Sequence, residues 1–126
     1  MDVTPLIPAG RQIIETYGDG RFRIANVLHP GSVLVFPAKT LMWAVTEMAA
    51  LDMASLQPVS LAAQSGEVKL LLLGCGPRLT QVPRDLRALL RADGIVIEPM
   101  DTGAAARTFN VLMAEGRWVA AALIAV

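Results

Sequence analysis

The sequence has very few of the residues that form disulfides, metal centres and basic surfaces. It contains one cysteine, Cys75, and one histidine, His29, so neither an internal disulfide nor a cysteine-rich metal site is expected. Eleven basic residues balance eleven acidic ones, and they form no cluster of the kind that contacts nucleic acid. We therefore expect no bound metal and no nucleic-acid partner.

Long hydrophobic runs are absent too, although 54% of the residues are hydrophobic and the mean hydropathy is +0.51. The most apolar stretch, residues 118–126, is far shorter than the roughly 20 residues that a membrane helix needs. The sequence thus predicts a protein that is not integral to a membrane. The apolar surplus indicates a sheet covered on both faces, a buried interface between copies of the chain, or both.

The N-terminal residues "MDVTPLIPAG" lack the basic start and the long apolar core of a signal peptide. We expect a cytoplasmic protein, or a mitochondrial one if the source is a eukaryote. Two prolines and a glycine predict that residues 1–11 form an arm. The remaining length suits one domain of ordinary size, residues 12–126.

The first half of that domain has the pattern of short antiparallel strands. Gly18-Asp19-Gly20 supplies the backbone freedom of a tight hairpin, and residues 21–25 alternate polar and apolar side chains. Residues 26–29 suit a turn. The predicted strands cover residues 12–17, 21–25, 31–36 and 41–46.

The second half alternates strands and helices. Predicted helices cover residues 55–64, 84–92 and 102–115, and predicted strands cover residues 68–73, 95–97 and 118–126. After Lys69, the first of these strands has no polar residue, which is typical of a strand covered on both faces. The order predicts an α/β domain with a mixed or parallel sheet and helices on its faces.

Gly74-Cys75-Gly76 follows an apolar strand, as a phosphate-binding loop does. A dinucleotide site needs a third glycine and a helix that opens directly over the phosphates. Here Leu79 occupies the third glycine position, and the next helix is predicted only from Arg84. No Gly-Lys-Ser/Thr follows either. We expect no nicotinamide, flavin or other cofactor, and a structural turn is the favoured interpretation.

Cys75 is also a possible nucleophile, because it follows a predicted central strand, where α/β sheets usually place ligands. A nucleophilic cysteine needs a base, and His29 is the one histidine available. No third member of a catalytic group is evident, so we expect no enzyme activity.

The segment "MDTGAAARTFNVL", residues 100–112, is the strongest site candidate. Asp101 and Thr102 stand where they can cap a helix, Gly103 opens a first turn with almost no side chains, and Arg107 and Asn110 share a helix face. If the sheet is parallel here, this corner lies near Gly74, Cys75 and Gly76. Together these residues predict a crevice that suits an anion. The alternative is that they pack the helix on the sheet and tie loops together.

Four segments, "YGDGRFRI", "GSVLVFP", "LLLGCGPRL" and "MDTGAAARTFNVLMAEGRWVAAAL", together resemble the Mth-type family of α/β domains. That family includes the mitochondrial respiratory complex I assembly factor 3 and an adipogenesis-associated protein. The resemblance spans about residues 10–126. It implies three layers, in which a mixed central sheet carries helices and the N-terminal half adds a β layer. It supplies no catalytic residues. The matching positions in the candidate crevice are Gly74, Gly76, Asp101, Thr102, Gly103, Arg107 and Asn110.

The resemblance implies a non-catalytic binding or assembly module. Its partner would be a protein that belongs to a membrane-bound respiratory complex or to a related assembly or translocation machinery, and a second copy of the chain stays open as a further partner. The alternative is a small-molecule or anion binder, or an enzyme, that uses the crevice around Cys75, Asp101 and Arg107.

Overall fold

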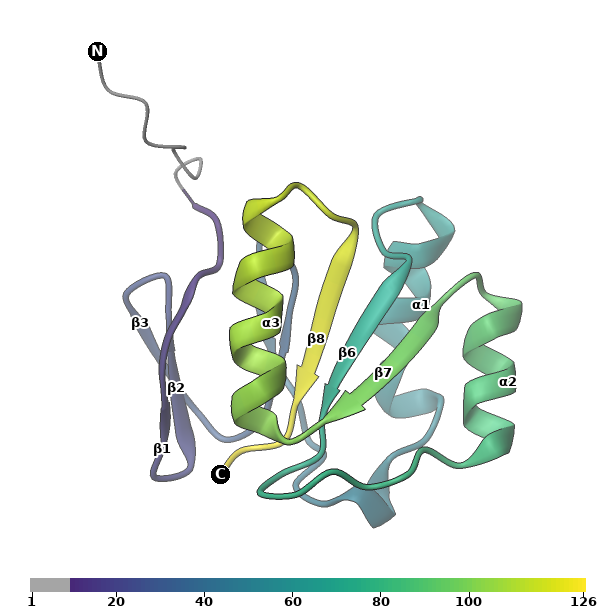
Figure 1. Ribbon diagram of the computed structural model, residues 1–126, viewed down its shortest axis with the longest axis horizontal. Helices are drawn as coiled ribbons and strands as arrows, with labels where there is room; N and C mark the ends of the chain where they lie inside the picture. Colours follow the sequence, from purple (N-terminus) through teal and green to yellow (C-terminus); the bar gives the residue numbers. More distant parts are fainter. Residues whose placement is uncertain (1–9) are drawn as a thin grey trace.

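The computed structural model describes residues 10–126, in which two sheets and three α-helices are arranged in layers (Figure 1). Most of the predicted arm, residues 1–11, lies outside the described residues. The smaller sheet has the order β1-β2-β3 and is antiparallel throughout. Its strands are β1 (Ile14–Gly18), β2 (Arg21–Ile24) and β3 (Val27–Pro30).

The two hairpins of the small sheet test the turn predictions. Gly18-Asp19-Gly20 forms the first turn, as expected, and all three residues have positive φ angles. The predicted turn at residues 26–29 is wrong. The chain reverses instead over Ala25 and Asn26, whose φ angles are 49° and 65°. Two left-handed residues make a two-residue turn whose twist suits a hairpin, so residues 27–30 are free to form the edge strand β3.

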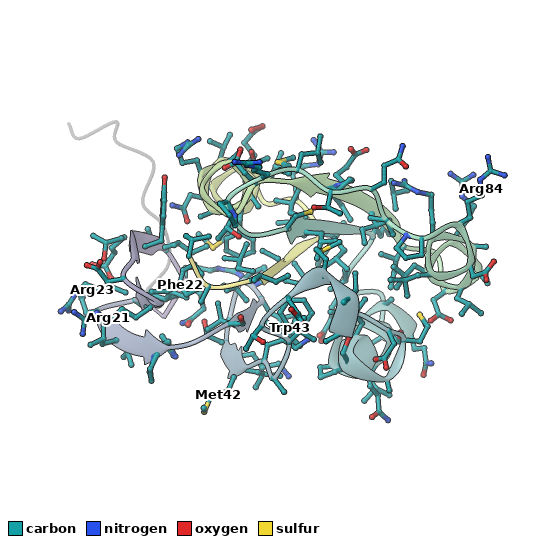
Figure 2. All side chains as sticks on the ribbon, turned by 90° about the horizontal axis from the view of Figure 1, so that it is seen from below. Arg21, Phe22, Arg23, Met42, Trp43 and Arg84 are labelled. Atoms are coloured by element: carbon teal, nitrogen blue, oxygen red, sulfur yellow. The ribbon has the colours of Figure 1, made fainter. Side chains whose placement is uncertain are left out.

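Strand β2 has one buried and one exposed face, as its alternating sequence predicts. Figure 2 shows Arg21 and Arg23 pointing outward, whereas Phe22 between them points toward the interior. Phe22 is 1% exposed. Strand β2 therefore presents an apolar face to the rest of the domain and two arginines to solvent.

The larger sheet is mixed and has the order β5-β4-β8-β6-β7. Strand β6 is parallel to β7 and β8, whereas β4 is antiparallel to β5 and β8. The strands are β4 (Val33–Val35), β5 (Thr40–Met42), β6 (Leu70–Gly74), β7 (Val96–Met100) and β8 (Val119–Leu123). Strand β5 ends earlier than predicted. Trp43 leaves the strand, turns its ring into the core and donates from Nε1 to the carbonyl of Ser55 at 2.8 Å.

Strand β6 is buried on both faces, as its unbroken leucine run predicts. Leu71 and Leu73 belong to a core with α1 (Gln57–Gln64) and α2 (Arg84–Ala92). Leu72 belongs to a second core with the small sheet and α3 (Thr102–Ala114). Short 3-10 turns, Met48–Ala50 and Ala54–Leu56, precede α1. The domain therefore has three layers: α1 and α2, the central sheet, and α3 beside the small sheet (Figure 1).

Candidate functional site

The predicted crevice maps to the carboxyl end of the parallel strands, which we call the carboxyl-end corner (residues 74–76 and 100–103). The register places Gly74 between Met100 of β7 and Leu123 of β8, so the two predicted segments do meet. A Cβ atom on Gly74 would lie 2.9 Å from Leu123 Cδ2 and 3.0 Å from Thr102 Oγ1. The corner closes this tightly because residue 74 has no side chain.

Thr102 is the fully buried polar residue of the corner. Its hydroxyl accepts from the Gly76 N–H at 2.9 Å and donates to the Ile124 carbonyl at 2.7 Å. Its own N–H donates to the Gly76 carbonyl at 2.8 Å. Thr102 is therefore not the helix cap that the sequence predicts. Asp101 takes that role and accepts from the Ala104 N–H at 2.9 Å.

Cys75 is 7% exposed and belongs to the core formed with α1 and α2. Its backbone N–H donates to the carbonyl of Met100 at 2.8 Å. The thiol lies 3.6 Å from the Thr80 carbonyl oxygen. His29 lies on β3, in the small sheet that packs on the opposite face of the central sheet. The pair weighed for nucleophilic chemistry is therefore not assembled.

The outer side of the corner is covered by Tyr17 of β1. A Cβ atom on Gly103 would lie 2.8 Å from the Tyr17 hydroxyl oxygen, so the ring rests directly on the first turn of α3. Arg107, one turn further on, donates from Nη1 to the same hydroxyl at 2.5 Å. Arg107 is exposed, and it gives this side of the corner a positive charge at the surface.

Asn110 lies two turns into α3 and bonds to β1 rather than to the corner. Its Oδ1 accepts from the Ile14 N–H at 2.9 Å, and its Nδ2 donates to the Ile14 carbonyl at 2.9 Å. The side-chain amide thus bonds to both the N–H and the carbonyl of one residue, as a residue of a neighbouring strand would. Of the eight predicted residues, six lie at the corner, Arg107 lies beside it, and Asn110 fastens the small sheet to α3.

A second region, at the opposite end of the parallel strands, was not singled out by the sequence. We call it the amino-end groove. It runs past three loops: residues 36–39 after β4, residues 65–69 before β6 and residues 115–118 before β8. Three cavities of 380, 330 and 130 Å³ lie along it. Lys39 and Glu67 line the first two, and Arg11, Pro37 and Trp118 line the last two.

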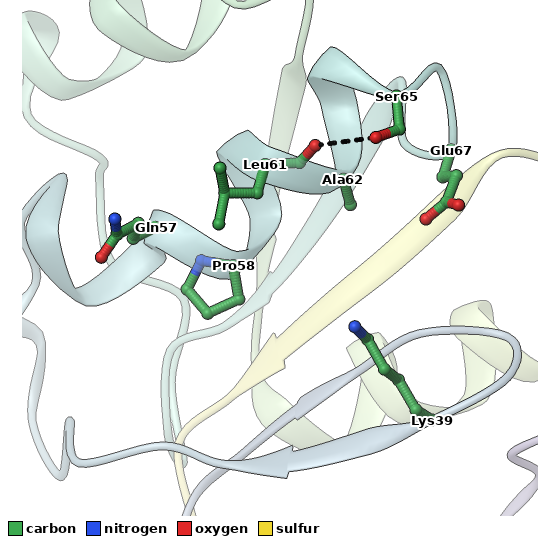
Figure 3. Close-up of a pocket in the computed structure, with 7 residues that line it drawn as sticks. All are labelled: Lys39, Gln57, Pro58, Leu61, Ala62, Ser65 and Glu67. Atoms are coloured by element: carbon green, nitrogen blue, oxygen red, sulfur yellow. Dashed lines mark hydrogen bonds between the residues drawn. The ribbon is translucent and has the colours of Figure 1, made fainter.

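The side chains of the first cavity are shown in Figure 3. Lys39 extends from its loop toward α1, and the carboxylate of Glu67 points back into the space between them. Gln57, Pro58 and Leu61 of α1 form the far wall. Sequence patterns did not reveal this region because its residues come from separate loops. The available signal was Trp118, an aromatic residue directly after Gly116 and Arg117 and just before the last strand.

The helices of residues 10–126 lack the length and hydrophobicity that a membrane span requires. That part of the chain also contains no group of three or more His, Cys, Asp and Glu side chains that could hold a metal ion.

The architecture defines the class: a three-layer α/β domain with a mixed central sheet. Within that class, the chain belongs to the family described as "Protein of unknown function (DUF498/DUF598)", whose model matches residues 14–124. The resemblance stated from the sequence is thereby confirmed.

Relatives and solved structures agree with this assignment. An uncharacterised protein of Rhodobacter capsulatus is 40% identical over 92% of this chain and 86% of its own length. The NADH dehydrogenase [ubiquinone] 1 alpha subcomplex assembly factor 3 of Xenopus tropicalis is 32% identical over 88% of this chain. The same assembly factor of Danio rerio is 32% identical over 89% of this chain. The match covers 60% and 63% of these two assembly factors.

Two solved structures share the fold closely. An outer membrane protein from Bartonella henselae has a TM-score of 0.85 and 39% identity, with 94% of this chain and 98% of that one covered. A Bordetella pertussis protein described as a Mth938-like domain has a TM-score of 0.83 and 28% identity, with 98% and 91% covered. These likenesses confirm the predicted α/β fold class.

Proposed function

We propose that the protein is a non-catalytic protein-binding module that assists the assembly of a membrane-bound respiratory NADH dehydrogenase. The observation that carries the proposal is the similarity to two assembly factors for that enzyme, each 32% identical over nearly nine-tenths of this chain. The module would act in the cytoplasm of a bacterium or in the mitochondrion of a eukaryote.

The geometry supports binding more than catalysis. At the carboxyl-end corner, the Thr102 hydroxyl and the Asp101 carboxylate are bonded to the protein's own backbone, and the Cys75 thiol is buried in the apolar core. The amino-end groove, in contrast, is open and combines apolar and charged side chains, as protein-recognition surfaces do.

Deletion of the gene in the native cell tests the proposal. We expect the fully assembled NADH dehydrogenase to decrease on native gels, with partly assembled forms accumulating, while a second respiratory complex stays at its normal level. The wild-type gene should restore assembly. If the deletion strain contains the complex at the normal level and activity, the proposal is wrong.

The alternative, a binder of small molecules or anions or an enzyme at the crevice of Cys75, Asp101 and Arg107, has narrower support. Its best feature is the exposed guanidinium of Arg107 beside the first turn of α3, since a helix N-terminus and an arginine both favour an anion. Calorimetry with inorganic phosphate and small carboxylates, on wild type and Arg107→Ala, tests this alternative. Saturable heat that disappears in the variant would favour it.

A further inference from the structure

We propose that the amino-end groove binds an extended, acidic peptide segment of a partner protein that carries an apolar side chain for Trp118. This inference deepens the proposed function and rests on it, because it takes the partner to be a protein. It assigns the recognition surface and the chemistry of the segment that the surface takes.

The first argument is the shape of the groove. Its three cavities share walls, because two side chains line both the first and the second, and three residues line both the second and the third. The path therefore continues from α1 across the loop after β4 to the C-terminal end of α3. A groove that is open along its length suits a chain segment, whereas small-molecule sites bury most of the ligand.

The second argument is the apolar surface in the middle of the path. Trp118 is 57% exposed. Its side chain lines both the second and the third cavity, beside Pro37. The carbonyl of Trp118 accepts from the N–H groups of Lys69 and Leu70 at 2.9 and 3.2 Å, so the backbone that carries the ring is fixed. An exposed tryptophan on a fixed backbone is the kind of residue that dominates binding energy at protein interfaces.

The third argument is charge. Among the lining residues that the structure describes, the basic side chains are Arg11, Lys39 and Arg117, and the one acidic side chain is Glu67. The whole chain has a formal net charge of zero, so this surface is positive relative to the protein as a whole. Lys39 Nζ lies 5.3 Å from the centre of the Phe36 ring. Complementary charge favours an acidic occupant and raises its association rate.

The experiment is a selection of random heptapeptides displayed on phage, with the purified full chain as bait. We expect enrichment of peptides that contain several Asp or Glu residues around an aromatic or aliphatic residue. Synthetic copies of the enriched peptides should shift the fluorescence of Trp118. Trp43 contributes a constant background, because it is 6% exposed and its indole N–H is bonded to Ser55.

Two variants locate the binding. We expect Trp118→Ala to weaken the enriched peptides by roughly tenfold or more, as hot-spot substitutions do. Lys39→Gln should weaken them less, mainly by slowing their association. Both side chains project from loops at the surface, so melting temperatures should stay close to that of the wild type. Met42→Ala and Arg84→Gln are the matched controls. Met42 is 79% exposed, and Figure 2 shows both side chains pointing away from the domain. Neither control should alter binding.

Several outcomes would overturn the inference: no enrichment, enrichment of basic peptides, or acidic peptides that bind Trp118→Ala as tightly as wild type. Vesicles of phosphatidylglycerol are added in a parallel titration. If they shift Trp118 fluorescence and the peptides do not, the groove is a membrane-contacting surface and the inference is wrong.

The deletion strain separates this inference from the proposed function. If assembly fails without the gene but is fully restored by Trp118→Ala, the assembly role stands and the groove is not its recognition surface. If acidic peptides bind the groove but the deletion leaves assembly intact, the binding surface stands and the assembly role is wrong.

Discussion

The two ends of the same three parallel strands are built in opposite ways. At the carboxyl-end corner, a glycine without space for a Cβ atom and a fully buried threonine draw β6, α3 and the last strand together. At the amino end, the loops leave a groove with an exposed tryptophan and three basic side chains. α/β sheets usually place ligands at the carboxyl ends of their strands. In this protein the corner at that end is tightly packed, and the cavity of 400 Å³ beside it, between α2 and the end of β7, is lined by Val82, Arg87 and Pro99 among other residues.

The largest expected effect comes from removal of the buried hydroxyl at the corner. Thr102→Val keeps the shape of the side chain but leaves the Gly76 N–H and the Ile124 carbonyl without the partner shown in the structure. Since each unsatisfied buried group costs about 1–3 kcal/mol, we expect a loss of roughly 2–4 kcal/mol in the free energy of unfolding, measured by urea titration. Thr102→Ser, which keeps the hydroxyl, should lose much less. Equal losses in the two variants would contradict the role given to the hydroxyl.

A smaller loss is expected at Gly74. Gly74→Ala places a methyl group against Leu123 and the backbone of Thr102 at distances of 2.9 and 3.0 Å. Overpacking of this kind costs about 1–3 kcal/mol, which should lower the melting temperature by several degrees. Ala88→Ser, on the exposed side of α2, is the control and should change stability little. An unchanged melting temperature in Gly74→Ala would show that the corner has more room than the structure gives it.

A still smaller loss of stability is expected where α3 bonds to the small sheet. Asn110→Ala removes both hydrogen bonds to Ile14, and we expect a loss of about 1–2 kcal/mol. Faster hydrogen exchange at the amides of β1 should accompany it. Asn110→Asp keeps the acceptor but places a carboxylate oxygen against the Ile14 carbonyl, so it should lose at least as much stability as Asn110→Ala. Unchanged exchange at the Ile14 amide would contradict the proposed link.

The smallest effect is expected outside the corner. Arg107 is exposed and bonds to Tyr17, and exposed polar contacts of this kind contribute less than about 1 kcal/mol. We expect Arg107→Ala to melt near the wild-type temperature and to bind the acidic peptides unchanged, because it lies away from the groove. A lower melting temperature would place Arg107 among the residues that hold the layers together. Loss of partner capture at an unchanged melting temperature would make it a second recognition point.

Features that depend on neighbouring residues could be predicted from the sequence. The unbroken run Leu70–Leu73 indicated a strand covered on both faces, and Asp101 directly before a small-residue helix indicated an N-cap. Turn chemistry was harder. Asn26 was recognised as a turn residue, but the structure also places Ala25 at positive φ, which alanine adopts rarely.

Features that depend on distant residues could not be predicted. The positions of Thr102 and Asn110 were identified, but their partners Ile124 and Ile14 come from other parts of the chain. The cover that Tyr17 forms over Gly103 likewise appears only when β1 and α3 are side by side. The amino-end groove could not be predicted for the same reason, since its walls come from loops far apart in sequence.

The position of β8 has a consequence for how the fold is reached. This strand follows every other described element along the chain, yet it lies between β4 and β6 in the middle of the central sheet. During synthesis the β4–β5 pair and the β6–β7 pair are made first, each with an unpaired edge where β8 will insert. The sheet can close only after residues 119–123 have been translated. Such late, non-local pairing slows folding. Until β8 pairs, the exposed strand edges can aggregate, so we expect chaperones to bind the nascent chain.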